Sequence, residues 1–290
     1  MKIRSIRFVI AAALAAVPTL LLAQPSAQYV PGSEGIKGAS LPPPGFYVRD
    51  YSYFYWAGQM NDASGHSSQP ANFNTFTYAN IPRAIWITDT KFLGGYVGVD
   101  ALLPLIDQHV KAGPLDNTTF GIGDFFGEGT LSWHIKHFDF AIGSGVWAPT
   151  GDFSPGSTRV GAGYWTFMQT AGATWYIDDG KTWAVSALNR FEFNTEQRDT
   201  HITPGDAYTM EWGVSKSVCK EADLGVVGYY QQQVTSSNGQ PLNRVAAIGP
   251  EVSAMFPKQM FFVSLRYNYE FMAKNRAQGN AVTLTLTKRF

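Results

Sequence analysis

The last thirty residues alternate between apolar and polar side chains, and this pattern constrains the fold more than any other stretch. From Phe261 to Phe271 one parity is apolar throughout, whereas the other carries polar side chains. These polar residues are Ser264, Arg266, Asn268 and Glu270. Successive side chains of a strand point to opposite faces, so one face is apolar and the other charged. An aromatic apolar face and a final Phe290 are typical of the closing strand of an outer-membrane barrel, although soluble antiparallel sheets also alternate.

The composition favours a barrel in a membrane. Charged residues make up 15% of the 290 residues, against about 25% in soluble domains, and there are 20 Phe, 14 Tyr and 8 Trp. No apolar run reaches the length of a transmembrane helix, so a membrane location requires a closed barrel, because lipid does not tolerate open sheet edges. A secreted β-sandwich stays open as the alternative. The single Cys219 cannot form an internal disulfide.

The N-terminus has the pattern of a secretory signal peptide. Three cations precede an apolar stretch, residues 8–22, which Pro18 interrupts. The cations are Lys2, Arg4 and Arg7. This stretch is shorter than the roughly 20 residues that a membrane-spanning helix needs, so an anchoring helix is the weaker alternative. We predict a signal peptide over residues 1–23, cleaved after Ala23 or, alternatively, after Ala27.

Residues 24–45 are rich in Pro, Gly and Ser and end in the sequence Leu41-Pro42-Pro43-Pro44-Gly45. Proline cannot donate a ladder hydrogen bond, so this segment cannot be a central strand. It is predicted to be either a periplasmic tail or a plug inside a barrel formed by residues 46–290.

Strand-like stretches alternate with breaks along the rest of the chain. There are about twelve of them, each near the roughly 9–11 residues that a tilted membrane strand needs. Long polar breaks, at 61–72, 108–118, 150–163, 194–205, 236–242 and 274–279, alternate with short ones near 91, 136, 179, 220 and 258. Outer-membrane barrels have short periplasmic turns and longer outer loops. The predicted fold is therefore an all-β, antiparallel transmembrane β-barrel of about twelve strands.

Short motifs spread over the mature chain resemble one family. They are Pro31-Gly32-Ser33-Glu34-Gly35, Leu41-Pro42-Pro43-Pro44-Gly45-Phe46-Tyr47, Gly121-Ile122-Gly123-Asp124, Ala148-Pro149-Thr150-Gly151-Asp152-Phe153, Pro204-Gly205-Asp206, Gly228-Tyr229-Tyr230 with Gln233, Ile248-Gly249-Pro250-Glu251-Val252, and Asn275 with Gly279. The chain resembles the meta-pathway phenol-degradation family of outer-membrane transporters, which is related in architecture to aromatic-hydrocarbon and fatty-acid channels. The resemblance implies an outer-membrane β-barrel with a transport role. Phe126 and Glu128, and the loop 195–203, depart from the family pattern.

Several charged and aromatic residues share the polar parity of their strands. The candidates for a permeation path are Asp124, Glu128, Arg190, Glu192, Glu211, Arg266, Asn268, Glu270, Trp147 and Phe262, and Glu251 is a weaker member. A charge that faces lipid at mid-membrane costs about 2–4 kcal/mol, so these side chains are predicted to face the lumen. The alternative is a salt-bridged wall that only fills space. Four further aromatic residues are assigned to the same parity, namely Phe54, Trp56, Tyr96 and Phe126.

Catalysis and metal binding have weaker support in the sequence. The stretch Ser236-Ser237-Asn238-Gly239 is similar to the serine site of outer-membrane phospholipases, but position 235, where the base belongs, is Thr235. A serine without a base is not activated, so this stretch is interpreted as a turn. His134 and His137 flank a short turn without a carboxylate cluster, so no metal site and no cofactor is predicted.

The resulting hypothesis is an outer-membrane channel for passive uptake of small hydrophobic, in particular aromatic, compounds. The alternatives are a filled structural barrel and a lipid hydrolase. Barrels of eight strands are packed and those of sixteen hold a water channel, so about twelve strands predict a narrow lumen. The expected partners are outer-membrane lipid, small hydrophobic solutes and the barrel assembly machinery, with Phe290 as assembly signal, and no nucleic acid.

Overall fold

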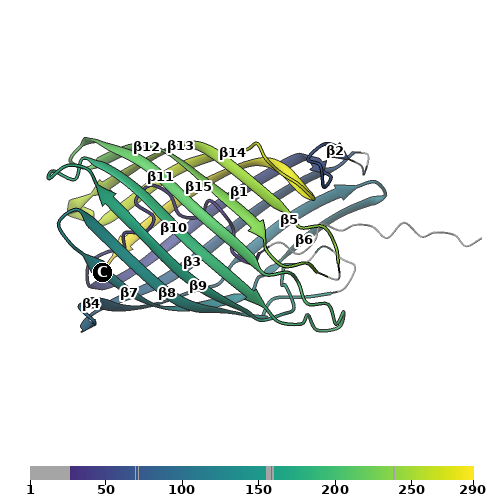
Figure 1. Ribbon diagram of the computed structural model, residues 1–290, viewed down its shortest axis with the longest axis horizontal. Coiled ribbons are helices and arrows are strands. Elements are labelled where there is room, and N and C mark those ends of the chain that lie inside the picture. The colour runs from purple at the N-terminus through teal and green to yellow at the C-terminus, as the bar shows by residue number, and fades with distance from the viewer. Residues whose placement is uncertain (1–26, 69, 71, 155–157, 159, 238) are drawn as a thin grey trace, which may run out of the picture.

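The computed structural model describes residues 27–290, except 69, 71, 155–157, 159 and 238. The described chain forms a closed, antiparallel barrel of twelve strands, as the sequence predicts (Figure 1). The barrel closes because β1 pairs with both the last strand and β3. The predicted signal peptide, residues 1–23, lies outside the described residues.

The barrel strands follow one another in chain order. They are β1 (Gly45–Asn61), β3 (Asn74–Phe92), β4 (Gly95–Leu102) continued by β5 (Leu105–Ala112), β6 (Leu115–Ile122) continued by β7 (Phe125–His134), β8 (Phe138–Ala148), β9 (Thr166–Tyr176), β10 (Trp183–Asn194), β11 (Ala207–Cys219), β12 (Ala222–Gln233), β13 (Arg244–Phe256), β14 (Phe261–Glu270) and β15 (Arg276–Arg289). The short β2 (Ser67–Ser68) lies in the first long loop, and the 3-10 turn η1 (Pro257–Gln259) joins β13 to β14. No helix among the described residues has the length and apolar character to cross a membrane.

Two of the wall strands are interrupted at the same height. β4 gives way to β5 at Leu103 and Pro104, and proline has no N–H to donate to the ladder. β6 gives way to β7 at Gly123 and Asp124, and the Gly123 N–H donates to the carbonyl of Pro104 at 2.8 Å. The wall therefore stays connected across both interruptions.

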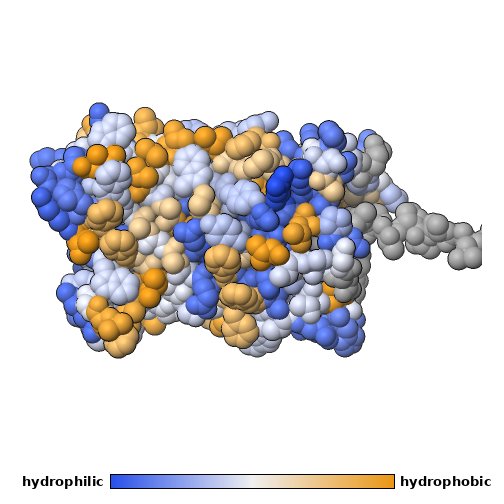
Figure 2. Space-filling model, viewed as in Figure 1, coloured by the Kyte–Doolittle hydropathy of each residue, from blue (hydrophilic) through white to orange (hydrophobic). Residues whose placement is uncertain are grey.

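The alternation of the C-terminal strands is confirmed. On β14 the side chains of Leu265 and Tyr269 are exposed outward, whereas Arg266, Asn268 and Glu270 are buried inside. Hydrophilic residues gather at the two ends of the visible face, and mostly hydrophobic or intermediate residues cover the wall between them (Figure 2). This distribution is typical of an outer wall that meets lipid.

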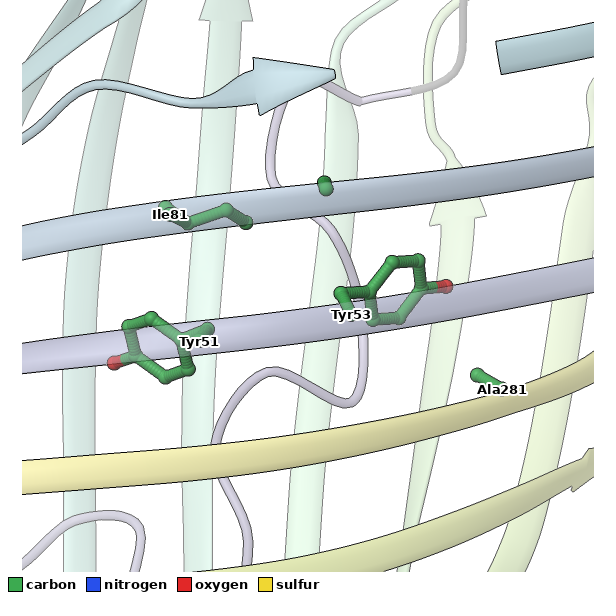
Figure 3. Packing of buried hydrophobic residues seen from close by; sticks show 5 residues of the cluster. Tyr51, Tyr53, Ile81 and Ala281 are labelled. Carbon is green, nitrogen blue, oxygen red and sulfur yellow. The ribbon is translucent and has the colours of Figure 1, made fainter. Parts of the chain in front are cut away.

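The parity predicted for the first strand is wrong. Phe54 and Trp56 face outward, and Trp56 is 40% exposed, whereas the tyrosines of the other parity face inward. Figure 3 shows two of these, Tyr51 and Tyr53, in a buried cluster with Ile81 of β3. Tyrosine has an apolar ring and a polar hydroxyl, so a lumen-facing run of tyrosines conceals the alternation on which the prediction depends.

The loops are sorted by end, as predicted. The short connections 93–94, 135–137, 177–182, 220–221 and 257–260 lie at the end where the chain terminates, and the long loops 62–73, 149–165, 195–206 and 234–243 lie at the other end. One predicted loop, 108–118, is wrong, because β5 and β6 continue through it as a hairpin that turns at Gly113 and Pro114. Gly113 has a φ of 58°, which glycine adopts without strain. Residues 108–118 are mostly polar, so no apolar face marks them as strands in the sequence.

Residues 27–44 run through the interior of the barrel. Gln28 donates to the carbonyl of Tyr164 and to the Thr166 hydroxyl, near the long loops. At the other end, the carbonyl of Pro43 accepts a hydrogen bond from the Tyr47 hydroxyl at 2.7 Å. We call residues 27–44 the inner segment.

Candidate functional site

The start of the inner segment is bound through Tyr29. The Tyr29 N–H donates to Glu192 Oε1 at 2.9 Å, and its carbonyl accepts from Gln231 Nε2 at 3.1 Å. The hydroxyl donates to Glu211 Oε2 at 2.6 Å. These wall residues are buried, so the hydrogen bonds to Tyr29 satisfy polar groups that water does not reach.

Glu34 binds the middle of the inner segment to β1 and β3. Its carboxylate accepts from the Tyr51 hydroxyl at 2.7 Å and lies 3.2 Å from the guanidinium groups of both Arg49 and Arg83. Burial opposes the charge of the carboxylate, but Arg49 and Arg83 outweigh it and lower the pKa of Glu34 to about 2. Glu34 is therefore ionised at neutral pH.

The backbone around Glu34 is held by charged groups on the opposite wall. The N–H of Glu34 donates to Glu211 at 3.1 Å, and the N–H of Ile36 donates to Glu251 at 2.9 Å. Arg266 donates to the carbonyls of Gly32 and Ser33. Carboxylates thus bind the amides, and a guanidinium binds the carbonyls.

Two glycines of the Pro31-to-Gly35 motif are required by this docking. Gly32 has a φ of 81°, a conformation that other residues rarely adopt. A Cβ on Gly35 would lie 1.7 Å from the Glu251 carboxylate. The motif therefore combines one charged side chain with a backbone that fits closely against the wall.

The inner segment divides the lumen into two cavities. A cavity of about 450 Å³, the upper cavity, lies toward the long loops, and its lining includes Ile81, Ile106, Val110, Phe126, Trp147 and Met168. A cavity of about 550 Å³, the lower cavity, lies toward the short turns, and its lining includes Tyr47, Arg49, Ile85, Phe262, Arg266 and Arg289. Glu34, Arg83, Glu128 and Arg190 line both cavities. We call these four residues the charged belt.

The ion pairs of the charged belt are mostly buried. Arg83 Nε lies 2.8 Å from Asp100, and its other nitrogens lie 3.2 Å from Glu34 and 3.6 Å from Glu128. Arg190 lies 2.8 Å from Glu211. Loss of one partner of a buried pair costs about 3–5 kcal/mol, so these charges hold one another in place.

The chain resembles known outer-membrane proteins in sequence and in fold. The family model described as "Putative MetA-pathway of phenol degradation" matches residues 57–286. The chain belongs to this family. The family resemblance expected from the short motifs is therefore confirmed. No curated protein matched the sequence.

Solved structures share the barrel fold. An outer membrane channel from Pseudomonas putida F1 superposes with a TM-score of 0.77 at 14% identity, covering 91% of this chain and 100% of that chain. The β domain of the Bordetella autotransporter BrkA gives 0.53 at 11% identity, covering 86% and 100%. The translocator domain of the autotransporter NalP from Neisseria meningitidis gives 0.53 at 10% identity, covering 88% and 91%. At these identities the likeness is one of fold.

Most of the predicted lumen charges contact the inner segment or a loop. Arg190, Glu192, Glu211 and Arg266 contact the segment, and Glu128 belongs to the charged belt. Asp124 accepts the N–H groups of Gly151 and Ala162, both at 2.8 Å, and so fixes the loop after β8.

The remaining predicted residues brace the wall or lie at its ends. Glu270 accepts hydrogen bonds from the Tyr55 and Tyr229 hydroxyls, and Asn268 is buried beside Gly32. The other aromatic candidates on the lumen side are Tyr96, Phe126, Trp147 and Phe262. The rings of Phe126 and Trp147 lie 4.6 Å apart at a tilt of 36°, and Phe262 is 47% exposed. The ring of Phe290 lies 6.1 Å from that of Phe46.

Sequence reasoning missed the residues that matter most for docking. Tyr29, Glu34, Arg49, Arg83 and Asp100 were not among the predicted site residues. The one signal that could have found them is Glu34, the single charged residue of the Pro31-to-Gly35 motif, since a lone carboxylate inside a lumen needs cationic partners.

The serine and histidine candidates have structural contacts. Ser237 Oγ accepts the Gly205 N–H at 2.7 Å and so joins two outer loops. His134 Nδ1 lies 3.0 Å from Asp139, and His137 Nδ1 lies 3.1 Å from the carbonyl of Tyr176. Over the residues that the structure describes, no group of three or more His, Cys, Asp or Glu side chains is placed to hold a metal ion.

Proposed function

We propose that this protein is an outer-membrane channel through which small hydrophobic molecules, aromatic ones in particular, enter passively. The observation that carries the proposal is the upper cavity, whose lining is largely aliphatic and aromatic although it lies on the lumen side of the wall. A purely aqueous pore does not need Phe126, Trp147 and Met168 there. Aromatic faces provide apolar solutes with weak binding sites, and weak sites allow a solute both to enter and to leave.

The charged belt lies on the route of such a solute. An apolar molecule that leaves the upper cavity meets Glu34, Arg83, Glu128 and Arg190 before it reaches the lower cavity. Glu34 belongs to the inner segment, whereas its partners Arg49 and Arg83 belong to the wall. We infer that the inner segment acts as a plug and that its displacement opens the route.

Export and assembly belong to the same proposal. Residues 1–23 would direct export as a signal peptide, and lipid would surround the outward aromatic and aliphatic side chains. The barrel assembly machinery would recognise the last strand through Phe290, which is 69% exposed. The compositional pattern of the N-terminus and the outward apolar face of β15 support these points.

Uptake of aromatic carbon sources tests the proposal. Cells that lack the gene should grow more slowly on low concentrations of phenol-like compounds than cells that carry it. Deletion of residues 28–44 should leave growth unaffected or accelerate it, and should raise the conductance of the purified protein in planar bilayers. Trp147→Ala should slow uptake, because it removes a ring from the upper cavity, whereas the outward Trp165→Ala serves as a matched control.

The alternative is a barrel that the inner segment and the lumen side chains fill without transport. Two observations favour it, namely the many hydrogen bonds of the inner segment and the buried ion pairs of the charged belt. The absence of any growth or uptake difference over a broad panel of aromatic compounds and fatty acids would leave this structural barrel as the function.

A further inference from the structure

The side chain of Tyr29 occupies a site that the wall builds around a phenol ring. The guanidinium carbon of Arg190 lies 4.0 Å from the ring centroid, and the hydroxyl donates to Glu211 at 2.6 Å. The ring is packed in a buried cluster with Phe126, Trp147 and Met168. The site thus offers a flat apolar surface, a cation on the ring face and an acceptor for the hydroxyl.

The wall supplies this site, but the inner segment supplies its occupant. Phe126, Trp147, Met168, Arg190 and Glu211 lie on five different strands, β7 to β11. The backbone of Tyr29 is held separately, by Glu192 and Gln231. The phenol group can therefore leave the site while the backbone keeps its own hydrogen bonds.

The site adjoins the upper cavity. Tyr29, Trp147 and Arg190 all line that cavity, so a solute in it reaches the ring of Tyr29 directly. The indole Nε1 of Trp147 is buried and has no hydrogen-bond partner among the described residues. A second hydroxyl or another acceptor on a bound ring would satisfy this donor.

We propose that this wall site, formed by Phe126, Trp147, Met168, Arg190 and Glu211, binds un-ionised phenols, and that Tyr29 occupies it until a phenol competes. The inference deepens the proposed channel function, because it specifies the substrate class and relies on that function for the route into the cavity. Binding itself is measurable without transport.

The site selects the un-ionised form of a phenol. Its acceptor is the carboxylate of Glu211, which is paired with Arg190 at 2.8 Å, so an added phenolate would place two negative charges in contact. Burial raises the pKa of the Tyr29 hydroxyl well above its usual value, although Arg190 opposes the shift. Tyr29 therefore occupies the site as a neutral donor at physiological pH.

Calorimetric titration of the purified mature protein with phenol tests the proposal. Tyr29→Ala empties the site, and an emptied apolar cavity binds a ring of matching size. Tyr29→Ala should bind phenol at least about tenfold more tightly than the parent, because the internal competitor and its charged hydrogen bond are lost. Tyr29→Phe keeps the ring but cannot donate to Glu211, so it should also bind at least about tenfold more tightly.

Two controls separate the site from non-specific partition. Tyr78→Ala removes a tyrosine whose ring contacts the outward Phe54 at 4.9 Å, so this variant should bind phenol as the parent does. Anisole cannot donate a hydrogen bond and should bind Tyr29→Ala at least about tenfold more weakly than phenol does. Should Tyr29→Ala fail to fold, Tyr29→Phe alone decides the question.

Equal phenol affinities for the parent, Tyr29→Ala and Tyr29→Phe would overturn the proposal, as would equal affinities of Tyr29→Ala for phenol and anisole. These results are distinct from a failure of transport. A protein that binds phenol as expected but gives no uptake difference would refute the channel and keep the site. Uptake without the expected change in affinity would keep the channel and refute the site.

Discussion

Replacement of Glu34 by glutamine should release the inner segment from β1 and β3. The carboxylate contacts Tyr51, Arg49 and Arg83 at 2.7, 3.2 and 3.2 Å, and the Glu34 side chain is only 12% exposed. Its pKa is lowered from 4.5 to about 2, and each unit corresponds to about 1.4 kcal/mol. The charge of Glu34 therefore contributes on the order of 3 kcal/mol to docking, with a small discount for its exposure.

A free-energy loss of about 3 kcal/mol raises the population of the released state roughly a hundredfold. Thiol labelling measures this population when the thiol is buried in the docked state. Ala39 is 1% exposed, so Ala39→Cys in a Cys219→Ser background reports release of the inner segment. Glu34→Gln should accelerate the labelling of this cysteine roughly a hundredfold, because reagent reaches it only after release.

The matched control is Glu196→Gln, which removes a carboxylate from a pair with His201 on an exposed loop. Exposed pairs contribute about 0–1 kcal/mol, so labelling should change by less than about fivefold. If Glu34→Gln changes the labelling rate no more than Glu196→Gln does, the reasoning is refuted. The ion pairs of Glu34 would then not hold the inner segment.

Three further expectations concern the pH dependence of docking, the close fit of Gly35 and the assembly of the barrel. Because the pKa of Glu34 is depressed, its contribution is complete above pH 4.5 and is lost as the pH falls through about 2, so the conductance of the parent should rise only in that acidic range and that of Glu34→Gln should not. Gly35→Ala places a Cβ against a wall carboxylate and should raise conductance at neutral pH, whereas Gly129→Ala, which has open space around it, should not. Deletion of Phe290 should lower the yield of inserted, heat-modifiable barrel in the outer-membrane fraction much more than a Ser237 substitution does; equal yields would show that the last residue is not an assembly signal.

The sequence predicts the wall well, because lipid imposes a period of two on every spanning strand. The strand count and the inward charges of β14 follow from that period, and the sorting of loop lengths follows from the polar breaks between the strands. The prediction fails where the two faces of a strand do not differ in polarity. On β1 both faces are aromatic, so Phe54 and Trp56 were assigned to the wrong face. The hairpin at 108–118 is predicted to be a loop because its residues are mostly polar, so no apolar face marks them as a strand.

The lumen could be predicted only in part. Inward charges such as Glu192, Glu211 and Arg266 can be predicted from the sequence, but their partners cannot. A strand pattern gives the face to which a side chain points and not the residue that it contacts. Their contacts with Tyr29 and Gly32 depend on where the inner segment lies. That position depends on irregular turns, such as the one at Gly32. An alternating sequence pattern does not predict such turns.

The sequence distances spanned by the inner segment have a consequence for the order of assembly. Tyr29 is 163 positions from Glu192, Ile36 is 215 from Glu251, and Gly32 is 234 from Arg266. Contacts between residues so far apart form late, since most of the chain must already be in place. Docking of the inner segment therefore follows the pairing of the central strands. Each newly folded barrel is therefore expected to pass through an interval in which the inner segment is not yet docked, and in that interval its lumen would be wider than in the finished protein.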